Sequence, residues 1–312
     1  MVTLTINGKK VKAAEGTSVL EAARAARIDI PTLCSNDALE PYGACRLCIV
    51  EINNSGRTTV EASCTYPVAD GLAVKTDSPR VIAGRKLVIE LLLARCPNVK
   101  RVKELAAEYG VTDSPDEFGK ENDYCVVCGQ CVRACNEVVK AGAIQFAGRG
   151  KDREVTSPFK QSAEDCIACG SCAFICPTGI IKKNDLESSQ VCTPEGCKQS
   201  GPKRELLNWQ VDYELAICKT CGNPFAPAPH LTKLTKEFYA LPQFFNVCPS
   251  CREYIKVDKD KCLGCGSCME NCPVGALELD DKGGYDKHAQ VYPQNCMACH
   301  TCEIYCPVGA LS

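Results

Sequence analysis

Hydrophobic and polar residues alternate at the very start of the chain. Residues 2–6 carry apolar side chains at every second position, an Asn-Gly pair follows, and residues 10–13 resume the alternation. Asn-Gly between two alternating runs is the strongest short-range signal for a β-hairpin. Ser18 and Glu21 then have the spacing of a helix-capping box, and the Ala-rich run after them predicts a short helix.

The alternating pattern returns at residues 47–52 and 58–60, which predict two more strands. Together these elements predict a small α+β module over residues 1–78. Ser78-Pro79 predicts the start of a helix, and a second helix is expected over residues 101–109. We interpret residues 79–120 as a helical connector.

Beyond this connector the pattern changes, because long apolar runs become few and Cys becomes frequent. The compact Cys-rich segments cover residues 121–185 and 256–312. Such segments cannot bury much apolar surface, so bound metal is expected to supply part of their folding free energy. Residues 186–255 lie between them, are interrupted by several Pro, and end in a Cys-Pro-Ser-Cys run.

Composition narrows the function classes. The chain has 312 residues, a formal net charge of −2 and 27 Cys. This charge gives no electrostatic footprint for nucleic acid. The N-terminus lacks the apolar core of a signal peptide, and the most apolar stretch, residues 87–94, is too short to span a bilayer. We therefore expect a cytoplasmic protein, in which clustered Cys indicate metal ligands rather than disulfides.

One Cys motif occurs four times. Its spacing, Cys-x2-Cys-x2-Cys-x3-Cys, is the bacterial-type [4Fe–4S] signature. The copies are Cys125, Cys128, Cys131 and Cys135; Cys166, Cys169, Cys172 and Cys176; Cys262, Cys265, Cys268 and Cys272; and Cys296, Cys299, Cys302 and Cys306.

The copies come in two pairs, as in two-cluster ferredoxins, where the fourth Cys of each motif binds the other cluster. This exchange predicts four ligand sets. They are Cys125, Cys128, Cys131 with Cys176; Cys166, Cys169, Cys172 with Cys135; Cys262, Cys265, Cys268 with Cys306; and Cys296, Cys299, Cys302 with Cys272. Structural zinc or disulfides are the alternatives, and four copies at one spacing argue against both. Cys296 to His300 also matches a c-type haem signature, but attaching haem would remove two ligands from a complete cluster motif.

The N-terminal module has a Cys set of its own, Cys34, Cys45, Cys48 and Cys64. Its spacing differs from both the cubane motif and the plant-type ferredoxin motif. Four thiolates on the loops of a strand-rich module nevertheless suit a [2Fe–2S] cluster, with a zinc site as the alternative. Gly43, just before Cys45, would allow the backbone to approach the cluster closely.

Two further Cys-x2-Cys pairs, Cys218 with Cys221 and Cys248 with Cys251, can hold one tetrahedral ion. Structural Zn²⁺ is the favoured interpretation, and a rubredoxin-like single iron is the alternative. Three Cys remain without an assigned ligand role: Cys96, Cys192 and Cys197.

Neither G-x-G-x-x-G after a strand nor a P-loop motif occurs in the sequence, so no nicotinamide or flavin site is expected in this chain. His230 and His288 are expected to be surface or packing residues rather than ligands.

Several of these motifs resemble a known family. Residues 1–180 look like the N-terminal part of the large iron–sulfur subunit of respiratory complex I, and still more like the accessory domains of iron-only hydrogenases and NAD-linked formate dehydrogenases. The residues that carry the resemblance are Ile30 to Cys34, Gly43 to Cys48, Cys131 to Asn136, Gly148 to Gly150, Asp165 to Cys172, and Cys176 to Gly179.

The resemblance implies a β-grasp [2Fe–2S] domain on Cys34, Cys45, Cys48 and Cys64, followed by a two-cluster ferredoxin domain. These relatives carry a further cluster on one His and three Cys between the two domains. Residues 91–98 contain no His and only Cys96, so that cluster is expected to be missing here. The relatives also continue into a catalytic domain. In its place this chain has the zinc-ribbon-like segment and a second ferredoxin module, so the relatives' catalytic activity is not expected of it.

The predicted fold class is therefore α+β. A β-grasp [2Fe–2S] domain (1–78) and a helical connector (79–120) precede a 2[4Fe–4S] domain (121–185), a zinc-ribbon-like segment (186–255) and a second 2[4Fe–4S] domain (256–312). We expect an electron-transfer subunit of a hetero-oligomeric oxidoreductase, with a flavoprotein subunit that handles NAD(P)H on one side and a catalytic subunit or ferredoxin on the other. The alternatives are a free-standing polyferredoxin and a small hydrogenase or dehydrogenase subunit.

Overall fold

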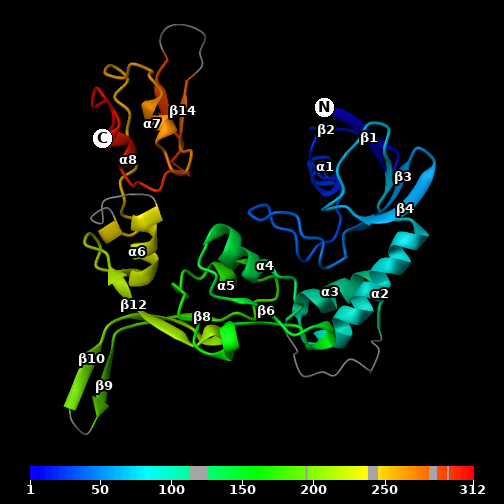
Figure 1. Ribbon diagram of the computed structural model, residues 1–312, viewed down its shortest axis with the longest axis horizontal. Helices are drawn as coiled ribbons and strands as arrows, with labels where there is room; N and C mark the ends of the chain where they lie inside the picture. Colours follow the sequence, from blue (N-terminus) through cyan, green and yellow to red (C-terminus); the bar gives the residue numbers. More distant parts are fainter. Residues whose placement is uncertain (113–124, 194–195, 238–244, 281–286, 294) are drawn as a thin grey trace. The chain divides into compact units, whose positions relative to one another are not determined.

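The computed structural model describes residues 1–112, 125–193, 196–237, 245–280, 287–293 and 295–312 (Figure 1). The predicted boundary between residues 120 and 121 lies outside these ranges. The chain divides into two compact units, and each is described here by itself. The first unit comprises residues 1–166, 170–182 and 207–210, and the second comprises residues 167–169, 183–206 and 211–312.

The first unit begins with a five-stranded mixed sheet and one helix. The elements are β1 (Val2–Ile6), β2 (Lys9–Ala13), α1 (Val19–Ala25), β3 (Ile49–Asn54), β4 (Arg57–Ala62) and β5 (Ala73–Lys75). Their order in the sheet is β2-β1-β5-β3-β4, and only the pairing of β1 with β5 is parallel. The predicted hairpin, helix and strands are confirmed, with their ends shifted by one or two residues.

Local chemistry explains these elements. Asn7 and Gly8 both have positive φ (49° and 80°), as a two-residue hairpin turn of type I′ requires. At the start of α1 the Ser18 hydroxyl accepts a hydrogen bond from the Glu21 amide at 3.2 Å, and the Glu21 carboxylate accepts one from the Ser18 amide at 2.6 Å. The alternating apolar residues of β1 and β3 pack with those of α1 in one hydrophobic core.

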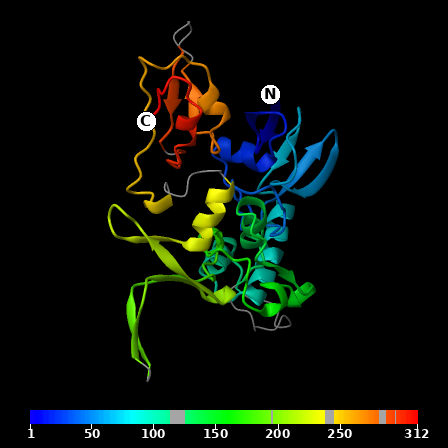
Figure 2. The ribbon, with the colours of Figure 1, turned by 60° about the vertical axis from the view of Figure 1, so that its left-hand side comes forward.

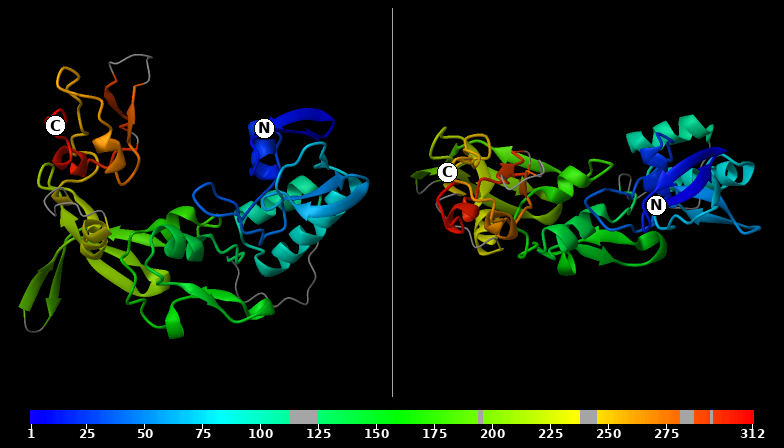
Figure 3. Two further views of the ribbon diagram at one scale, coloured as in Figure 1. Left: turned by 45° about the horizontal axis from the view of Figure 1, so that its top comes forward. Right: turned by 90° about the horizontal axis from the view of Figure 1, so that it is seen from above.

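Two helices, α2 (Pro79–Arg95) and α3 (Lys100–Tyr109), form the connector, and they lie alongside one another in Figure 3. α2 begins where Ser78 accepts a hydrogen bond from the Val81 amide, and α3 ends at Gly110 in the left-handed conformation, both as the sequence predicts. Arg85 is buried in α2 and donates hydrogen bonds to the carbonyl oxygens of Leu47 (3.0 Å) and Ile49 (2.8 Å). The connector is thereby fastened to the loop that leads into β3.

The Cys-rich part of the first unit consists of short elements. They are α4 (Gln130–Arg133), a π-helical turn (Ala134–Val138), β6 (Gln145–Ala147), β7 (Glu154–Thr156), α5 (Ser171–Ile175), and the 3-10 turns Gly150–Asp152, Pro158–Lys160 and Leu207–Trp209. Strands β6 and β7 pair as a two-stranded antiparallel ribbon. Most of the described residues of this region form loops, as its lack of apolar runs predicts.

In the second unit, a four-stranded antiparallel sheet has the order β13-β12-β11-β8. Its strands are β8 (Lys183–Leu186), β11 (Lys203–Leu206), β12 (Val211–Ile217) and β13 (Pro224–Pro227), and α6 (Ala228–Glu237) follows. Strands β9 (Ser189–Thr193) and β10 (Gly196–Ser200) form a separate hairpin, visible as the yellow-green pair in Figure 2. Within the sheet the Arg204 guanidinium bonds both carboxylate oxygens of Asp185, at 2.6 and 2.9 Å.

The C-terminal residues fold around short elements: α7 (Ser267–Glu270), β14 (Leu277–Leu279), β15 (Ala289–Val291) and α8 (Thr301–Ile304). Their buried cluster mixes a few aliphatic side chains, such as Leu277 and Leu311, with Cys268 and Cys302. An isolated bridge joins Val257 to Leu311. So small an apolar core agrees with the expectation that this region needs metal to fold.

Candidate metal centres

The four N-terminal cysteines gather at one end of the β1–β5 sheet region. Cys34, Cys45 and Cys48 lie on the loop before β3, and Cys64 follows β4; all but the half-buried Cys45 are buried. The thiols form two hydrogen-bonded pairs, Cys34 with Cys45 and Cys48 with Cys64. The loop also bends backbone N–H groups toward sulfur, since the Leu33 amide lies 3.4 Å from Cys45 Sγ. The structure thus brings the predicted set together.

The pairing has an electrostatic consequence. The hydrogen bond from Cys34 lowers the pKa of the Cys45 thiol to about 6, and the one from Cys64 lowers the pKa of Cys48 to about 6. The pKa values of Cys34 and Cys64 are raised in turn. Two of the four sulfurs are therefore suited to be thiolates near neutral pH, the form that binds metal.

Gly43 stands next to this set with φ of 68°. A Cβ atom built there would lie 3.3 Å from the Thr65 side chain. Glycine therefore permits both the left-handed backbone and the close approach of this loop to the one that carries Cys64.

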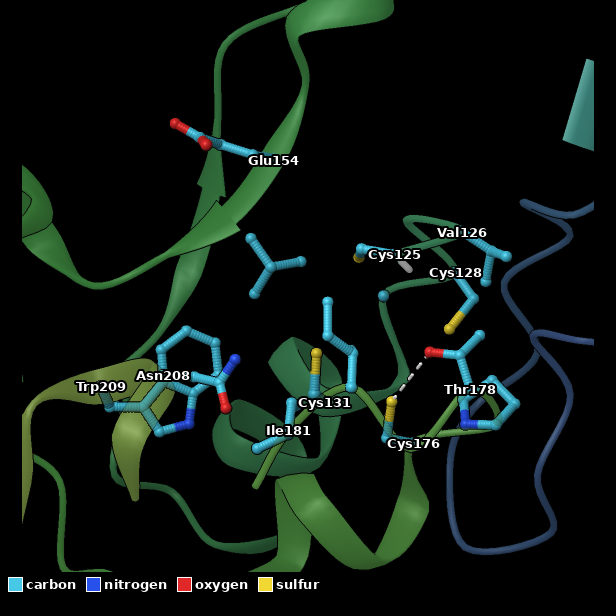
Figure 4. A pocket seen from close by; sticks show the side chains of 14 residues that line it. Cys125, Val126, Cys128, Cys131, Glu154, Cys176, Thr178, Ile181, Asn208 and Trp209 are labelled. Atoms are coloured by element: carbon cyan, nitrogen blue, oxygen red, sulfur yellow. Dashed lines mark hydrogen bonds between the residues drawn. The ribbon is translucent and has the colours of Figure 1, made fainter. Parts of the chain in front are cut away.

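The first cubane set surrounds a cavity of about 170 Å³ whose lining includes Cys125, Cys128, Cys131 and Cys176. Figure 4 shows their sulfur atoms turned toward the same space. The fourth of these cysteines, Cys176, belongs to the second motif, and the exchange of ligands between the motifs stays a prediction.

Burial shapes the chemistry of this cavity. It raises the pKa of Cys125 and of Cys131, and together with the thiols of Cys176, Cys125 and Cys45 it raises the pKa of Cys128 to about 11. Four converging thiolates in such a place would be costly without positive charge among them. Iron ions supply that charge, so the cavity and its donor atoms fit a cluster.

The four motifs share one backbone geometry. In each, the residue before the second Cys and the residue after it have positive φ. The pairs are Val127 and Gly129, Ala168 and Gly170, Gly264 and Gly266, and Ala298 and His300. Alternation of right- and left-handed residues turns successive N–H groups inward, which forms the anion-binding concavity seen at many iron–sulfur sites. All four loops therefore have left-handed residues at the two positions where they can shape such a concavity.

His300 occupies the position that is Gly in the other three motifs. Its φ is 58°, and its Nδ1 lies 2.7 Å from the Glu303 carboxylate. His belongs to the few residue types that enter the left-handed region fairly often. His300, which completes the match to the c-type haem signature, is therefore the turn residue of a cluster loop and interacts with Glu303.

Three cysteines of the second cubane set belong to the first unit. Cys166 and Cys172 are buried and Cys135 is half-buried, all in the first unit, whereas Cys169 belongs to the second unit. The thiol of Cys172 adds to the raised pKa of Cys131, so the first and second sets adjoin at these two residues. The grouping of all four as ligands stays a prediction.

In the second unit both remaining cubane sets assemble. A pocket is lined by Cys262, Cys265, Cys268 and Cys306, again with the fourth Cys taken from the other motif. Burial raises the pKa of Cys302 to about 12, with further contributions from the thiols of Cys299, Cys272 and Cys296.

The zinc-ribbon-like segment brings Cys218, Cys221, Cys248 and Cys251 together, with every pair of sulfur atoms within 4.8 Å. Cys221 Sγ and Cys248 Sγ are 3.8 Å apart. Backbone N–H groups of Cys248 and Cys221 lower the pKa of Cys218 to about 6, whereas the hydrogen bond that the Cys251 thiol donates to Cys248 raises the pKa of Cys251 to about 12. The set has the compactness of a single-ion site.

The cysteines outside these sets have different surroundings. Cys96 ends α2 and is buried among Val99, Val102 and their neighbours. Cys192 and Cys197 stand at paired positions of the β9–β10 hairpin. His230 is half-buried in α6, and burial lowers its pKa.

Four residues around the candidate centres were not singled out by sequence reasoning. Arg95 donates to the Cys125 carbonyl at 3.1 Å, and Gln130 donates to the Leu33 carbonyl at 2.7 Å. Trp209 donates to Cys172 Sγ at 3.3 Å, and Arg252 donates to the Met297 carbonyl at 3.1 Å. The only available signal was that Gln130 replaces the Ser or Thr found before the third Cys in the other three motifs.

Comparison with known protein families identifies two kinds of domain. Residues 1–79 match the 2Fe-2S iron-sulfur cluster binding domain. Residues 124–180 and 261–310 each match the 4Fe-4S dicluster domain. The predicted [2Fe–2S] and [4Fe–4S] domains are thereby confirmed, in a chain of mixed helix and strand.

Three curated relatives are similar to part of the chain. The NADP-reducing hydrogenase subunit HndD of Solidesulfovibrio fructosivorans is 34% identical, over 59% of this chain and 36% of its own length. The NADPH-Fe(3+) oxidoreductase subunit alpha of Geobacter sulfurreducens is 32% identical, over 58% and 24%. A subunit of an NADH-quinone oxidoreductase of Rhizobium meliloti is 31% identical, over 70% and 30%.

The chain therefore spans well under half the length of each of these relatives. The resemblance to iron–sulfur subunits of NAD(P)-linked oxidoreductases, inferred from the motifs, is confirmed for the matched region. Among the described helices, none combines the length and the apolar character needed to cross a membrane.

Proposed function

We propose that this protein is an electron-transfer subunit of a multi-subunit oxidoreductase. It would relay single electrons between a flavoprotein subunit that handles NAD(P)H and a catalytic subunit or ferredoxin. The relatives' names support the first partner, because each contains NADH or NADPH, or refers to NADP reduction. Cysteines that act as metal ligands, rather than as disulfide partners, also suit a reducing compartment such as the cytoplasm.

The single observation that carries this proposal is that cysteines from three of the sets lie close together within the first unit. The Cys45 thiol adds to the raised pKa of Cys128, and the Cys172 thiol adds to that of Cys131. Charges affect each other's pKa mainly at short range, so Cys45 lies near Cys128 and Cys172 lies near Cys131. Electron transfer between clusters weakens steeply with distance, and such a series is what a relay needs.

Two side chains hold the N-terminal cysteine loop against the first cubane motif. Gln130, buried between the second and third Cys of its motif, donates to the Leu33 carbonyl next to Cys34. Arg133 donates to the Glu40 carbonyl on the same N-terminal loop, and its guanidinium stacks over the Tyr42 ring at 5.1 Å. Both contacts fasten the loop of the N-terminal set to the first cubane motif.

The ligand assignment follows the motifs. Cys34, Cys45, Cys48 and Cys64 would hold a [2Fe–2S] cluster, and the four cubane sets would hold four [4Fe–4S] clusters. Such clusters accept and release one electron at a time, whereas hydride chemistry requires a flavin or nicotinamide on a dedicated site. The chain's own contribution is to hold the thiolates, to direct backbone N–H groups inward and to set the order of the sites.

The sixth cysteine set, Cys218, Cys221, Cys248 and Cys251, would hold a structural Zn²⁺. A tetrahedral ion with Zn–S bonds of about 2.3 Å places its sulfurs about 3.8 Å apart. The Cys221–Cys248 separation of 3.8 Å equals this value. A single iron would need nearly the same spacing, so metal analysis decides between the two.

The test is a comparison of electron donors under anaerobic conditions. The isolated chain should be bleached by dithionite yet show no NADH-dependent dye reduction. Adding the flavoprotein that co-purifies with it from the native source should restore that activity. NADH oxidation at enzymatic rates by the flavin-free chain alone would overturn the proposal, and failure of any partner to co-purify would favour a free-standing carrier.

A further inference from the structure

A short segment returns to the first unit from a distant part of the sequence. Residues 207–210 lie between β11 and β12, yet they dock on the Cys-rich loops of residues 125–182. The Ala163 amide donates to the Trp209 carbonyl at 3.2 Å, and the Ser162 hydroxyl donates to the Gln210 carbonyl at 3.1 Å. The Lys182 amide donates to Asn208 Oδ1 at 2.8 Å. Three hydrogen bonds thus fix the segment in place.

This segment carries the single Trp of the chain. Trp209 is 4% exposed, and its indole Nε1 lies 3.3 Å from Cys172 Sγ. Trp209 also lines the cavity of Cys125, Cys128, Cys131 and Cys176, where Figure 4 shows its ring at the side of the cavity. The indole therefore touches a cysteine of the second set and borders the space of the first.

We propose that Trp209 is a positioning residue that sets the reduction potential of the cluster bound by Cys172. The inference rests on the proposed function, because it takes Cys172 to be a cluster ligand. Reduction adds negative charge to a cluster, and an N–H group directed at a ligand sulfur stabilises that charge. The indole N–H should therefore raise the potential of this cluster relative to one that lacks the bond.

The hydrogen bond distinguishes this role from packing. A buried indole N–H needs an acceptor, and at this position Cys172 Sγ is the acceptor. Packing alone would be served equally well by Phe, which has no donor. Since the sequence has a single Trp, the other motifs cannot have this contact, so the cluster on Cys172 should differ in potential from the others.

The first experiment is a redox titration, monitored by EPR, of the full-length holoprotein and of Trp209→Phe. The variant keeps an aromatic ring but removes the donor. We expect the potential of one [4Fe–4S] cluster to fall while the others stay unchanged. Leu207→Ala is the matched control, because Leu207 belongs to the same turn but is 56% exposed. It should leave every potential unchanged.

The second experiment needs no variant. Because the chain has one Trp, labelling with ¹⁵N-indole tryptophan places a single reporter at Nε1. Pulsed EPR of the reduced holoprotein should show coupling between this ¹⁵N and one cluster spin, together with one proton on that nitrogen that exchanges with D₂O. Were Trp209→Phe to lose its cluster altogether, the wild-type ¹⁵N spectrum would still decide the question.

The outcomes separate this inference from the proposed function. If wild-type protein shows its cubane signals but neither ¹⁵N coupling nor a shift in Trp209→Phe, the role of Trp209 is wrong and the relay stands. If the wild-type chain assembles no [4Fe–4S] cluster at all, the proposed function itself fails. Coupling together with the downward shift would establish Trp209 as the residue that sets this potential.

Discussion

The two dicluster regions carry the same motif twice and embed it differently. In residues 124–180, side chains from elsewhere in the unit reach the cluster loops: Arg95 bonds the Cys125 carbonyl, and Trp209 bonds Cys172 Sγ. In residues 261–310, the Arg252 side chain likewise reaches a cluster loop at the Met297 carbonyl, but the cysteine sulfurs accept hydrogen bonds from amides of the region itself, such as Ala276 to Cys272 Sγ and Ala289 to Cys262 Sγ. The motif therefore specifies the conformation of the loop, whereas the surrounding residues determine which further hydrogen bonds the loop and its cysteines receive.

The comparison extends to single positions. All four loops have the same pair of positive φ angles, but the residue before the third Cys differs. It is Gln130 in the first motif, where its side chain reaches the Leu33 carbonyl, and Ser267 in the third, where its hydroxyl lies 3.6 Å from Cys265 Sγ. A contact to another domain thus replaces a contact within the loop.

The largest expected effect comes from removing the metals. Anaerobic chelation should unfold residues 256–312, because their core is small and made partly of cysteines. Residues 1–79 should stay folded, because their sheet and α1 bury an aliphatic core of their own. Hydrogen exchange of the apo-chain checks this difference. Protection of the C-terminal region equal to that in the holoprotein would show that its fold does not depend on metal.

Removal of one ligand should have a smaller, local effect. Cys45→Ala should abolish the [2Fe–2S] EPR signal and leave the [4Fe–4S] signals in place, because the N-terminal set lies on loops that carry no cubane cysteine. Cys268→Ala is the counterpart in the second unit and should cost one cubane signal while sparing the [2Fe–2S] signal. Loss of all signals from either variant would mean that the sites fold as one, contrary to the contrast drawn between the regions.

A third variant tests the hydrogen bond between Gln130 and the N-terminal loop. Gln130→Ser copies the residue of the second and third motifs and leaves the buried Leu33 carbonyl without this donor. An unsatisfied buried carbonyl costs about 1–3 kcal/mol, so amides of residues 33–48 should exchange faster while the iron content is unchanged. Ser267→Ala, the matched change in the second unit, should leave exchange in residues 33–48 unchanged. Equal exchange in the wild type and in Gln130→Ser would show that this hydrogen bond does not stabilise the N-terminal loop.

The smallest expected effect concerns Cys96. It is fully buried beside Val99 and Val102 at the end of α2, where its neighbours are apolar. Cys96→Ala should lower stability by about 1 kcal/mol through the lost sulfur volume and leave iron content and every EPR signal unchanged. A missing cluster in this variant would reveal a metal site that the cysteine count leaves out.

Sequence patterns could predict the local elements because their causes are local. The turn at Asn7-Gly8, the capping box of Ser18 and Glu21, and the stop at Gly110 depend on a few neighbouring residues. Three of the four cysteines that line the first cavity share one motif loop, so their grouping also has a local cause.

The contacts between distant segments could not be predicted in this way. Nothing in the sequence around Trp209 indicates that it meets a cysteine 37 residues earlier. Likewise, Gln130 and Leu33 are 97 residues apart, and their hydrogen bond depends on how the N-terminal loop and the first motif pack. Long-range packing decides such pairs, whereas periodicity and spacing report only local geometry.

The central claim, a chain of one [2Fe–2S] and four [4Fe–4S] clusters, is tested most directly by counting iron, acid-labile sulfide, zinc and reducing equivalents in one anaerobic holoprotein sample. The account predicts about 18 iron atoms and as many sulfides per chain, about one zinc, and uptake of about five electrons. Zinc in place of iron, or uptake of no more than a single electron by the fully reconstituted protein, would contradict it.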